Sequence, residues 1–160
     1  MSVTIRAMTV AEFETVRQWS ITSQAEELMA ENRLCREASI REAAEEFTAM
    51  LPHGLHTANN YLMTILAQEK PVGFLWTLHE ETAGRKQSFL CDFAIWESKR
   101  RKGYASAALT LAEANAAAAG CVESVLFVSD SNIAAKALYE KCGYRAFRQA
   151  GHGMYMMKQL

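Results

Sequence analysis

The chain has 160 residues, half of them hydrophobic, and a formal net charge of −1 at neutral pH. This length and composition predict one domain, residues 1–160, with a sizeable core. The charge argues against a nucleic-acid-binding surface, which needs a basic excess, and no apolar run is long enough to span a bilayer. We therefore expect neither nucleic acid nor a membrane as a partner.

The cysteines and histidines, four of each, indicate neither a disulfide framework nor a metal centre. No Cys-x-x-Cys pair occurs, and no histidine lies near a cysteine. The N-terminus also lacks the apolar run of a signal peptide. These features predict free thiols, a cytoplasmic protein and no metal.

The beginning of the chain predicts a strand followed by a helix. Val3–Met8 reads as the first strand. Thr9–Glu12 is a capping box, in which each side chain bonds the backbone N–H of the other residue, and it predicts a helix through about Asn32. Ser20–Ser23 is a point at which this helix could break.

The next segment predicts a second helix and a hairpin. Ser39–Glu42 is a second capping box, which predicts a helix that ends before Pro52. The following elements are then expected: a loop at Leu51–Asn60, a strand at Tyr61–Gln68, a turn at Glu69–Pro71, a strand at Val72–Leu78 and a polar turn at Glu80–Lys86.

The second half of the chain alternates strands and helices. The expected elements are a buried strand at Gln87–Trp96, an alanine-rich helix at Tyr104–Ala119 ended by Gly120, a strand at Ser124–Val128, a helix begun by Asn132, and a hairpin of Tyr144–Gln149 and Met154–Lys158. This order predicts an α/β fold, with one mixed central sheet of about six to seven strands flanked by helices.

The segment Arg100–Ala105 joins the buried strand to the alanine-rich helix. A basic loop with one glycine at a helix N-terminus presents backbone N–H groups that bind phosphate oxygens well. The alternative is a solvated turn that caps an ordinary helix. Neither a Walker A nor a Gly-x-Gly-x-x-Gly pattern is present to decide between the two.

A second segment, Asn132–Tyr144, changes the balance. Together with Arg100–Ala105 it resembles the GNAT superfamily of N-acyltransferases. The loop matches the family pattern (Arg or Gln)-x-x-Gly-x-(Gly or Ala), and the second segment matches Asn-x-x-Ala-x-x-Leu-Tyr-x-Lys-x-Gly-(Phe or Tyr). The resemblance implies the GNAT fold and an acetyl-CoA-dependent N-acetyltransferase, in which a primary amine attacks the thioester directly.

The resemblance also implies which residues bind acetyl-CoA. They are Arg100, Arg101, Lys102, Gly103, Tyr104 and Ala105 at the pyrophosphate, the main chain of Phe93, Ala94 and Ile95 at the pantetheine arm, and Asn132 and Tyr139. Tyr139 is implied to protonate the departing thiolate, and its alternative is a core tyrosine. Asn132 is alternatively the N-cap of its helix, and both roles can hold at once.

The general base that deprotonates the amine has no fixed position in this family. Asp92 interrupts an apolar strand, so we expect a desolvated carboxylate with a raised pKa. Its alternative is a buried aspartate satisfied by backbone N–H groups or a basic side chain. Glu80, Glu81 and His79 are further candidates, although solvated turn carboxylates are the simpler interpretation of the two glutamates.

The acceptor site is expected at the loop Leu51–Asn60, which holds His53 and His56 beside an apolar leucine. A surface connector is the alternative. The acceptor is expected to be a small-molecule amine or a peptide or protein amine, and a homodimer is a possible assembly. The alternative function is an acyl-CoA-binding module or sensor without turnover.

Overall fold

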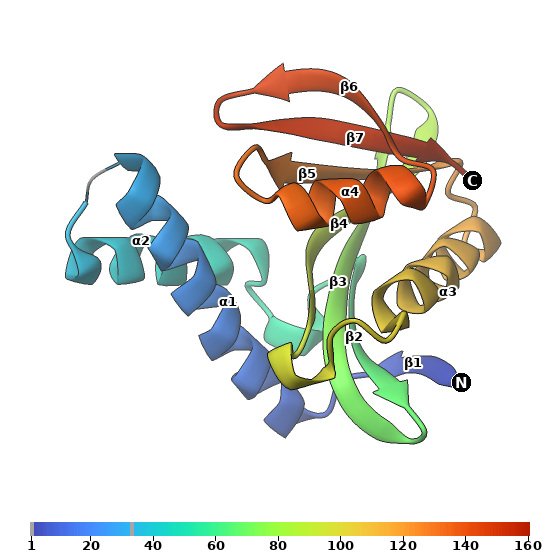
Figure 1. The fold of residues 1–160 in the computed structure, drawn as a ribbon, viewed down its shortest axis with the longest axis horizontal. Helices are drawn as coiled ribbons and strands as arrows, with labels where there is room; N and C mark the ends of the chain where they lie inside the picture. Colours follow the sequence, from blue (N-terminus) through green and yellow to red (C-terminus); the bar gives the residue numbers. More distant parts are fainter. Residues whose placement is uncertain (1, 33) are drawn as a thin grey trace. The chain divides into compact units, whose positions relative to one another are not determined.

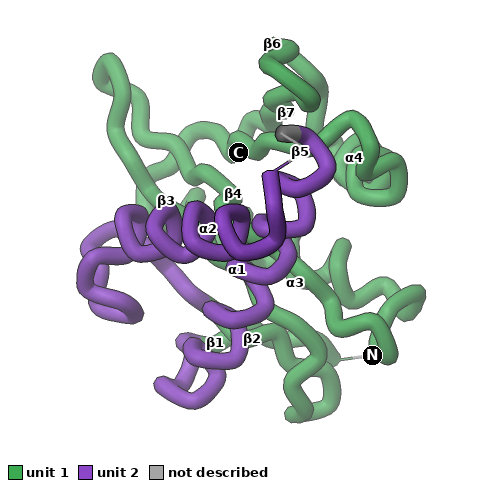
Figure 2. Tube along the Cα trace, turned by 90° about the vertical axis from the view of Figure 1, so that its left-hand side faces the viewer, with its two compact units in different colours: residues 1–6, 63–160 green, residues 7–62 purple. Residues whose placement is uncertain are grey.

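The computed structural model describes residues 2–32 and 34–160. They form a mixed sheet of seven strands, in the order β1-β2-β3-β4-β5-β7-β6, and four α-helices (Figure 1), which confirms the predicted fold class. The chain divides into two compact units, shown in Figure 2. Unit 1 comprises residues 1–6 and 63–160, and unit 2 comprises residues 7–62.

Unit 2 contains two helices, α1 (Val10–Asn32) and α2 (Arg36–Met50). The predicted capping box opens α1, because Thr9 N–H donates to Glu12 Oε1 at 2.9 Å and Glu12 N–H donates to Thr9 Oγ1 at 3.2 Å. The helix continues through Ser20–Ser23, so the break considered there is wrong. Its buried face extends across this segment and keeps it helical.

The second helix begins earlier than the capping box predicted at Ser39–Glu42, because Cys35 caps it. Cys35 has an extended backbone, and its Sγ accepts the N–H of Ala38 at 3.5 Å. Sulfur is a weak acceptor outside the usual N-cap residues, so residue preferences did not indicate this start. Ser39 is a fully buried residue inside the helix. The predicted box is therefore wrong.

The strands follow the predicted order. Their bounds are β1 (Val3–Ala7), β2 (Asn60–Ala67), β3 (Lys70–Thr82), β4 (Arg85–Ile95), β5 (Glu123–Ser129), β6 (Arg145–Ala150) and β7 (Gly153–Gln159). The first two strands have residues in both units, and the others belong to unit 1.

The turns on either side of β3 are tighter than predicted. Gln68 and Glu69 have φ of 51° and 66°, and Ala83 and Gly84 have φ of 53° and 76°. Two successive residues with positive φ give a type I′ turn, whose twist matches that of a hairpin. The turn predicted at Glu69–Pro71 therefore lies one residue earlier, and β3 and β4 extend into the segment predicted as a polar turn.

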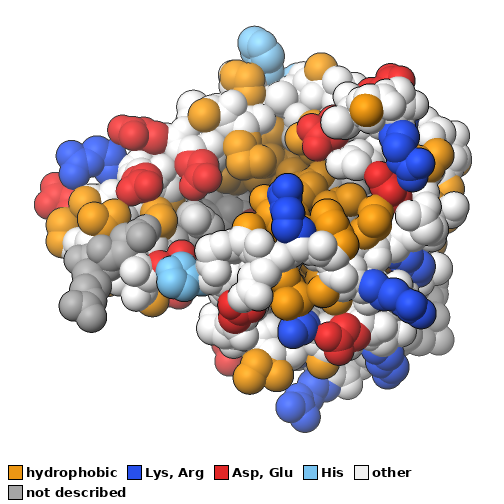
Figure 3. All heavy atoms as spheres, turned by 90° about the horizontal axis from the view of Figure 1, so that it is seen from above, with side chains coloured by type: hydrophobic (Ala, Val, Ile, Leu, Met, Phe, Trp, Pro, Cys, Tyr) orange, Lys and Arg blue, Asp and Glu red, His pale blue; other side chains and the backbone are white. Residues whose placement is uncertain are grey.

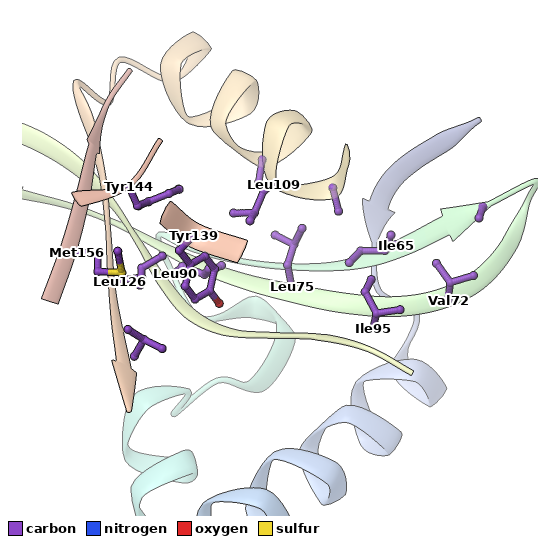
Figure 4. Packing of buried hydrophobic residues seen from close by; sticks show 14 residues of the cluster. Ile65, Val72, Leu75, Leu90, Ile95, Leu109, Leu126, Tyr139, Tyr144 and Met156 are labelled. Atoms are coloured by element: carbon purple, nitrogen blue, oxygen red, sulfur yellow. The ribbon is translucent and has the colours of Figure 1, made fainter. Parts of the chain in front are cut away.

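Unit 1 also contains α3 (Tyr104–Ala118), α4 (Ile133–Lys141) and a short 3₁₀ helix, η2 (Glu97–Lys99). Its hydrophobic core joins both α-helices to the strands, as the side chains in Figure 4 show. Its labelled members include Leu75, Leu90, Leu109, Leu126, Tyr139, Tyr144 and Met156. The core therefore contains Tyr139, as expected if this residue is a core tyrosine.

An aromatic cluster joins β5 to the C-terminal hairpin of β6 and β7. Phe127 and Phe147 are 43% and 50% exposed, and both rings contact that of Tyr155. The guanidinium of Arg148 lies 4.5 Å from the Tyr155 ring centroid, a favourable cation–aromatic arrangement. Figure 3 shows one face of the molecule on which hydrophobic side chains are exposed beside Lys and Arg.

Candidate active site

Strands β4 and β5 pair over only part of their length. Their parallel register joins Gln87–Leu90 to Glu123–Leu126, and within the described residues it gives Cys91–Ile95 no partner on β5. Beyond this point β5 pairs with β7 alone, and β4 and β5 run in different directions in Figure 1. The C-terminal half of β4 therefore has one edge paired with β3 and one edge open on the side of β5.

A hydrogen bond at the end of β4 shows which main-chain groups face this open edge. Trp96 N–H donates to Val72 O at 2.8 Å. Every second residue counted back from Trp96 therefore directs its main-chain N–H and C=O groups toward β3. Ala94 is one of these, and its carbonyl lies where a Cβ on Gly73 would be. Phe93 and Ile95 consequently direct their N–H and C=O groups to the open edge. Of the three main-chain sites predicted for the pantetheine arm, the geometry favours these two.

A β-bulge lies just before the open edge. Trp76 pairs with Asp92 and Thr77 pairs with Leu90, so Cys91 is an extra residue in β4. Bulges bend a strand and are common next to active sites. Burial, with smaller contributions from nearby carboxylates, raises the pKa of the Cys91 thiol to about 12. This thiol therefore stays protonated at neutral pH and is a poor nucleophile.

Asp92 follows the bulge, and its side chain is half-buried. Its Oδ1 accepts the N–H of Phe93 at 2.9 Å, so the structural interpretation of this aspartate is observed in part. Its charge also reaches Tyr139, because it contributes to raising the pKa of that phenol. The two predicted catalytic residues therefore lie within electrostatic range of each other.

The loop after β4 folds back on the strand. Arg100 Nε donates to the Ile95 carbonyl at 2.9 Å. Arg101 and Gly103 have φ of 63° and 80°, in the left-handed region that glycine adopts at little cost. These conformations turn the chain sharply into α3. The positive φ of Gly103 therefore explains why a glycine occupies this position of the predicted phosphate loop.

The first turn of α3 has N–H groups that no helix bond uses. Gly103 is the N-cap residue, and its carbonyl accepts the N–H of Ala107 at 3.3 Å. The N–H groups of Tyr104, Ala105 and Ser106 therefore precede the helix ladder. Together with the positive end of the helix dipole, they can bind an anion such as a phosphate.

Asn132 is the residue before α4, and Tyr139 lies within this helix. Asn132 Oδ1 accepts the N–H of Ala135 at 3.2 Å, so the N-cap role is observed. Tyr139 is 8% exposed, and its hydroxyl points away from Leu109 in Figure 4. Burial, followed by the charge of Asp92, raises the pKa of this phenol to about 12. The phenol is therefore protonated at neutral pH and can act as a proton donor.

The other base candidates lie outside this arrangement. His79 pairs with Ser88, in the part of the sheet where β4 and β5 are still joined. Burial, and then the charge of Lys86, lowers the pKa of His79. Glu80 and Glu81 are exposed near the end of β3, as expected of solvated carboxylates.

His53 and His56 belong to unit 2, where a short 3₁₀ helix, η1 (Gly54–His56), follows α2. Both side chains are exposed. The loop is closed by Thr57, whose Oγ1 accepts the N–H of His53 at 3.1 Å. A role for the two histidines at the amine remains a prediction.

Sequence reasoning missed a polar network behind Tyr139. It joins Glu113 on α3 to Ser124 on β5, to Tyr144 after α4 and to Lys158 on β7. One signal was available in the sequence, because Glu113 is the single charged residue in the alanine-rich segment Tyr104–Ala118.

Neither a metal cluster nor a membrane-spanning helix is found within residues 2–32 and 34–160. No group of three or more His, Cys, Asp and Glu side chains in this part of the chain could hold a metal ion. Among the helices that the structure describes, none has the length and apolar character needed to cross a membrane.

Comparison with known proteins gives a consistent result. Residues 21–144 match the model of the acetyltransferase (GNAT) family. The uncharacterized N-acetyltransferase YycN of Bacillus subtilis is 30% identical over 146 residues, which cover 91% of this chain and 94% of YycN. A crystal structure of YycN has a TM-score of 0.86 at 28% identity, with 93% of this chain and 96% of that chain covered.

Two more distant structures share the fold. The PaiA N-acetyltransferase of Thermoplasma acidophilum, in complex with coenzyme A, has a TM-score of 0.72 at 19% identity and is covered completely, as is this chain. The spermidine N-acetyltransferase of Vibrio cholerae, in complex with CoA and spermine, has a TM-score of 0.67 at 16% identity, with 98% of this chain and 95% of that chain covered.

Proposed function

Because the chain belongs to the acetyltransferase (GNAT) family, we propose that it transfers the acetyl group of acetyl-CoA to a primary amine, whose nitrogen attacks the thioester directly. One observation carries this proposal. Within unit 1, the chain runs from the open edge of β4 through η2 and a short loop to the unbonded first-turn N–H groups of α3, and the charge of Asp92 on β4 reaches Tyr139 on α4. The coenzyme A complex of PaiA, which has the same fold, supports it.

The residues of this edge and turn fit acetyl-CoA. The N–H groups of Tyr104–Ser106 would bind the pyrophosphate, with the exposed side chains of Arg101 and Lys102 beside them. The Phe93 carbonyl and the Ile95 N–H would bond the pantetheine amides, as a sheet edge binds an added strand, because the Phe93 N–H already donates to Asp92 and the Ile95 carbonyl already accepts from Arg100. Bound acetyl-CoA supplies the activated thioester carbonyl.

Arg100 and Asn132 each form a hydrogen bond within the protein. Arg100 uses Nε to hold the Ile95 carbonyl, so we propose that it shapes the loop as well as neutralising phosphate charge. Asn132 caps α4 with Oδ1, which leaves Nδ2 as the donor that would reach the pantetheine arm.

The chemistry needs one base and one acid. A lysine-like amine has a pKa of about 10.4 and must lose a proton before it attacks. We propose that Asp92 accepts this proton, directly or through water. As the new C–N bond forms and the C–S bond breaks, Tyr139 donates its phenol proton to the departing sulfur. Its pKa of about 12 keeps that proton in place until charge develops on the sulfur.

The charge distribution supports a cationic acceptor. Residues 7–62 contain nine glutamates, no aspartate and four arginines, whereas the rest of the chain has an excess of Lys and Arg. A basic unit suits the anionic cofactor, and an acidic unit suits a protonated amine. The spermidine N-acetyltransferase with bound spermine is a fold relative that acts on such amines. We propose that His53 and His56 line the amine side.

We further propose that the 160 residues act as one catalytic domain in the cytoplasm. The four cysteines are free in the structure, in keeping with a reducing compartment.

The experiment is a coenzyme A release assay with acetyl-CoA and an amine panel of spermidine, putrescine, lysine and a lysine-containing peptide. We expect thiol release that depends on at least one of these amines. Acetyl-CoA binding by calorimetry, without release for any of them, would instead support the binding-module alternative.

A further inference from the structure

The turn after α4 places two tyrosines against each other. Gly143 has a φ of 99°, its N–H donates to Glu140 O at 3.1 Å, and the N–H of Tyr144 donates to Tyr139 O at 2.9 Å. These two bonds form a Schellman cap, in which the residue after the glycine commonly packs on the residue five positions before it. Here the two residues are Tyr144 and Tyr139, whose ring centroids are 5.9 Å apart with planes at 63°.

The other end of the Tyr144 ring is held by a polar network. Its hydroxyl lies 2.8 Å from Ser124 Oγ and donates to Glu113 Oε1 at 3.1 Å. Glu113 Oε2 accepts from Lys158 Nζ at 2.7 Å. Tyr144 is only 2% exposed, so water does not compete effectively for these bonds. Helix α3 and strands β5 and β7 therefore all fix one ring.

Lys158 ties the network to the cap itself. Its Cε lies 3.4 Å from the position that a Cβ on Gly143 would take. The side chain of Glu113 is 11% exposed, and a shielded ion pair is a poor source of stability because desolvation offsets much of its attraction. A fixed orientation of the Tyr144 ring is the effect that this arrangement does produce.

We propose that Tyr144 is a positioning residue for Tyr139. The network of Ser124, Glu113 and Lys158 holds the Tyr144 ring, and the edge-to-face contact of that ring fixes the direction of the Tyr139 phenol toward the departing sulfur. This inference rests on the proposed acetyl transfer. It assigns Tyr144 no contact with substrate, because its hydroxyl is bonded to Ser124 and Glu113.

A kinetic double-mutant cycle tests the coupling, with acetyl-CoA and the most reactive amine of the panel. We expect Tyr144→Leu, which removes the ring, to lower kcat at least tenfold with little change in the KM for acetyl-CoA. Tyr144→Phe keeps the ring contact but removes both hydroxyl bonds that hold the ring, so we expect its kcat to lie between those of wild type and Tyr144→Leu. In a Tyr139→Phe background, Tyr144→Leu should change kcat less than about twofold, because the group that it orients is already gone.

A second readout does not depend on turnover. The Tyr139 Cζ resonance, assigned with Tyr139→Phe in protein labelled with ¹³C-tyrosine, reports the environment and titration of the phenol. We expect it to shift and broaden in Tyr144→Leu and, more weakly, in Glu113→Gln. The Glu113→Gln variant keeps the Tyr144 ring, so it still tests the proposal if Tyr144→Leu does not fold.

The outcomes separate the two proposals. An unshifted Tyr139 resonance in these variants, or an equal loss of kcat in both backgrounds, overturns the positioning role. If Tyr139→Phe itself retains wild-type turnover, the acid role assigned under the proposed function fails instead.

Discussion

Tyr139 shows how one residue can be both a core side chain and a candidate acid. It lies in the hydrophobic cluster of unit 1, so the structural interpretation of this tyrosine is correct as far as packing goes. The same burial, with the charge of Asp92, raises the pKa of the phenol to about 12 and keeps it protonated. Packing therefore supports the proposed proton donation rather than competing with it.

Replacing Tyr139 by Phe keeps the ring and removes the acid. We expect kcat to fall roughly ten- to a thousandfold, while acetyl-CoA affinity barely changes. Because the pKa is raised, the wild-type kcat should show no loss of a protonated acid between about pH 7 and about pH 10. Stopped assays over this range measure both effects, and unchanged turnover in the variant would remove Tyr139 from the mechanism.

Gly103 tests the phosphate loop. Gly103→Glu places a side chain and a negative charge at the N-terminus of α3, so we expect acetyl-CoA affinity to fall at least tenfold, about 1.4 kcal/mol, by calorimetry. Gly84→Glu is the matched control, because Gly84 also has positive φ, at 76°, and nothing lies within 4 Å of its added Cβ. Equal affinities in the two folded variants would exclude this loop as the binding site.

Among the elements, the predictable features were those with local causes. The capping box at Thr9 gave the start of α1, and the spacing of the motif Tyr139–Tyr144 is that of a Schellman cap. The start of α2 depended on an unusual sulfur cap at Cys35. The bulge at Cys91 depends on pairing with β3, which no local pattern in β4 reveals.

The buried carboxylate of Glu123 on β5 bonds side chains of β4 and β7, in the part of the sheet where β4 and β5 are paired. Glu123 Oε2 accepts from Arg85 at 3.1 Å, and Oε1 accepts from the Gln87 amide at 3.0 Å. Burial alone would raise the pKa of Glu123, but the Arg85 guanidinium and the amides of Gln87 and Gln159 outweigh burial and lower it. Glu123 therefore stabilises the fold above the ordinary glutamate pKa, and this contribution is lost as the pH falls.

Glu123→Gln should reduce the free energy of unfolding by about 1 kcal/mol at neutral pH, a modest value because Arg85 is largely exposed. The difference in the free energy of unfolding between wild type and Glu123→Gln should narrow as the pH is lowered through about 4. Urea titrations at several pH values measure it. A difference that stays constant with pH would show that the charge of Glu123 is not responsible.

For the molecule as a whole, the sequence predicted the α/β fold, because the fold rests on hydrophobic runs and short motifs, and the same motifs carry the proposed position of the cofactor loop. The acceptor side was less predictable. We propose it at the loop with His53 and His56, whose exposed polar residues specify no single ligand. The excess of glutamate in residues 7–62 is the sequence property that bears most on the acceptor.

The two units should unfold together. β1 and β2 contribute residues to both, so separate unfolding would break a shared sheet. Trp19 lies in unit 2, and Trp76 and Trp96 lie in unit 1. The Trp19→Phe variant keeps only the tryptophans of unit 1, and the Trp76→Phe/Trp96→Phe variant keeps only that of unit 2. We expect the fluorescence of the two variants to give coincident urea transitions. Separated midpoints would show that residues 1–160 are not one cooperative domain.

Acetyl transfer to an amine is tested most directly by mass spectrometry of the amine after incubation with ¹³C-acetyl-CoA. We expect one labelled N-acetyl group in the product for each coenzyme A released, with both reduced in Gly103→Glu and in Tyr139→Phe but not in Gly84→Glu. Release of coenzyme A without labelled amine, or labelled amine formed equally by all of these variants, would contradict it.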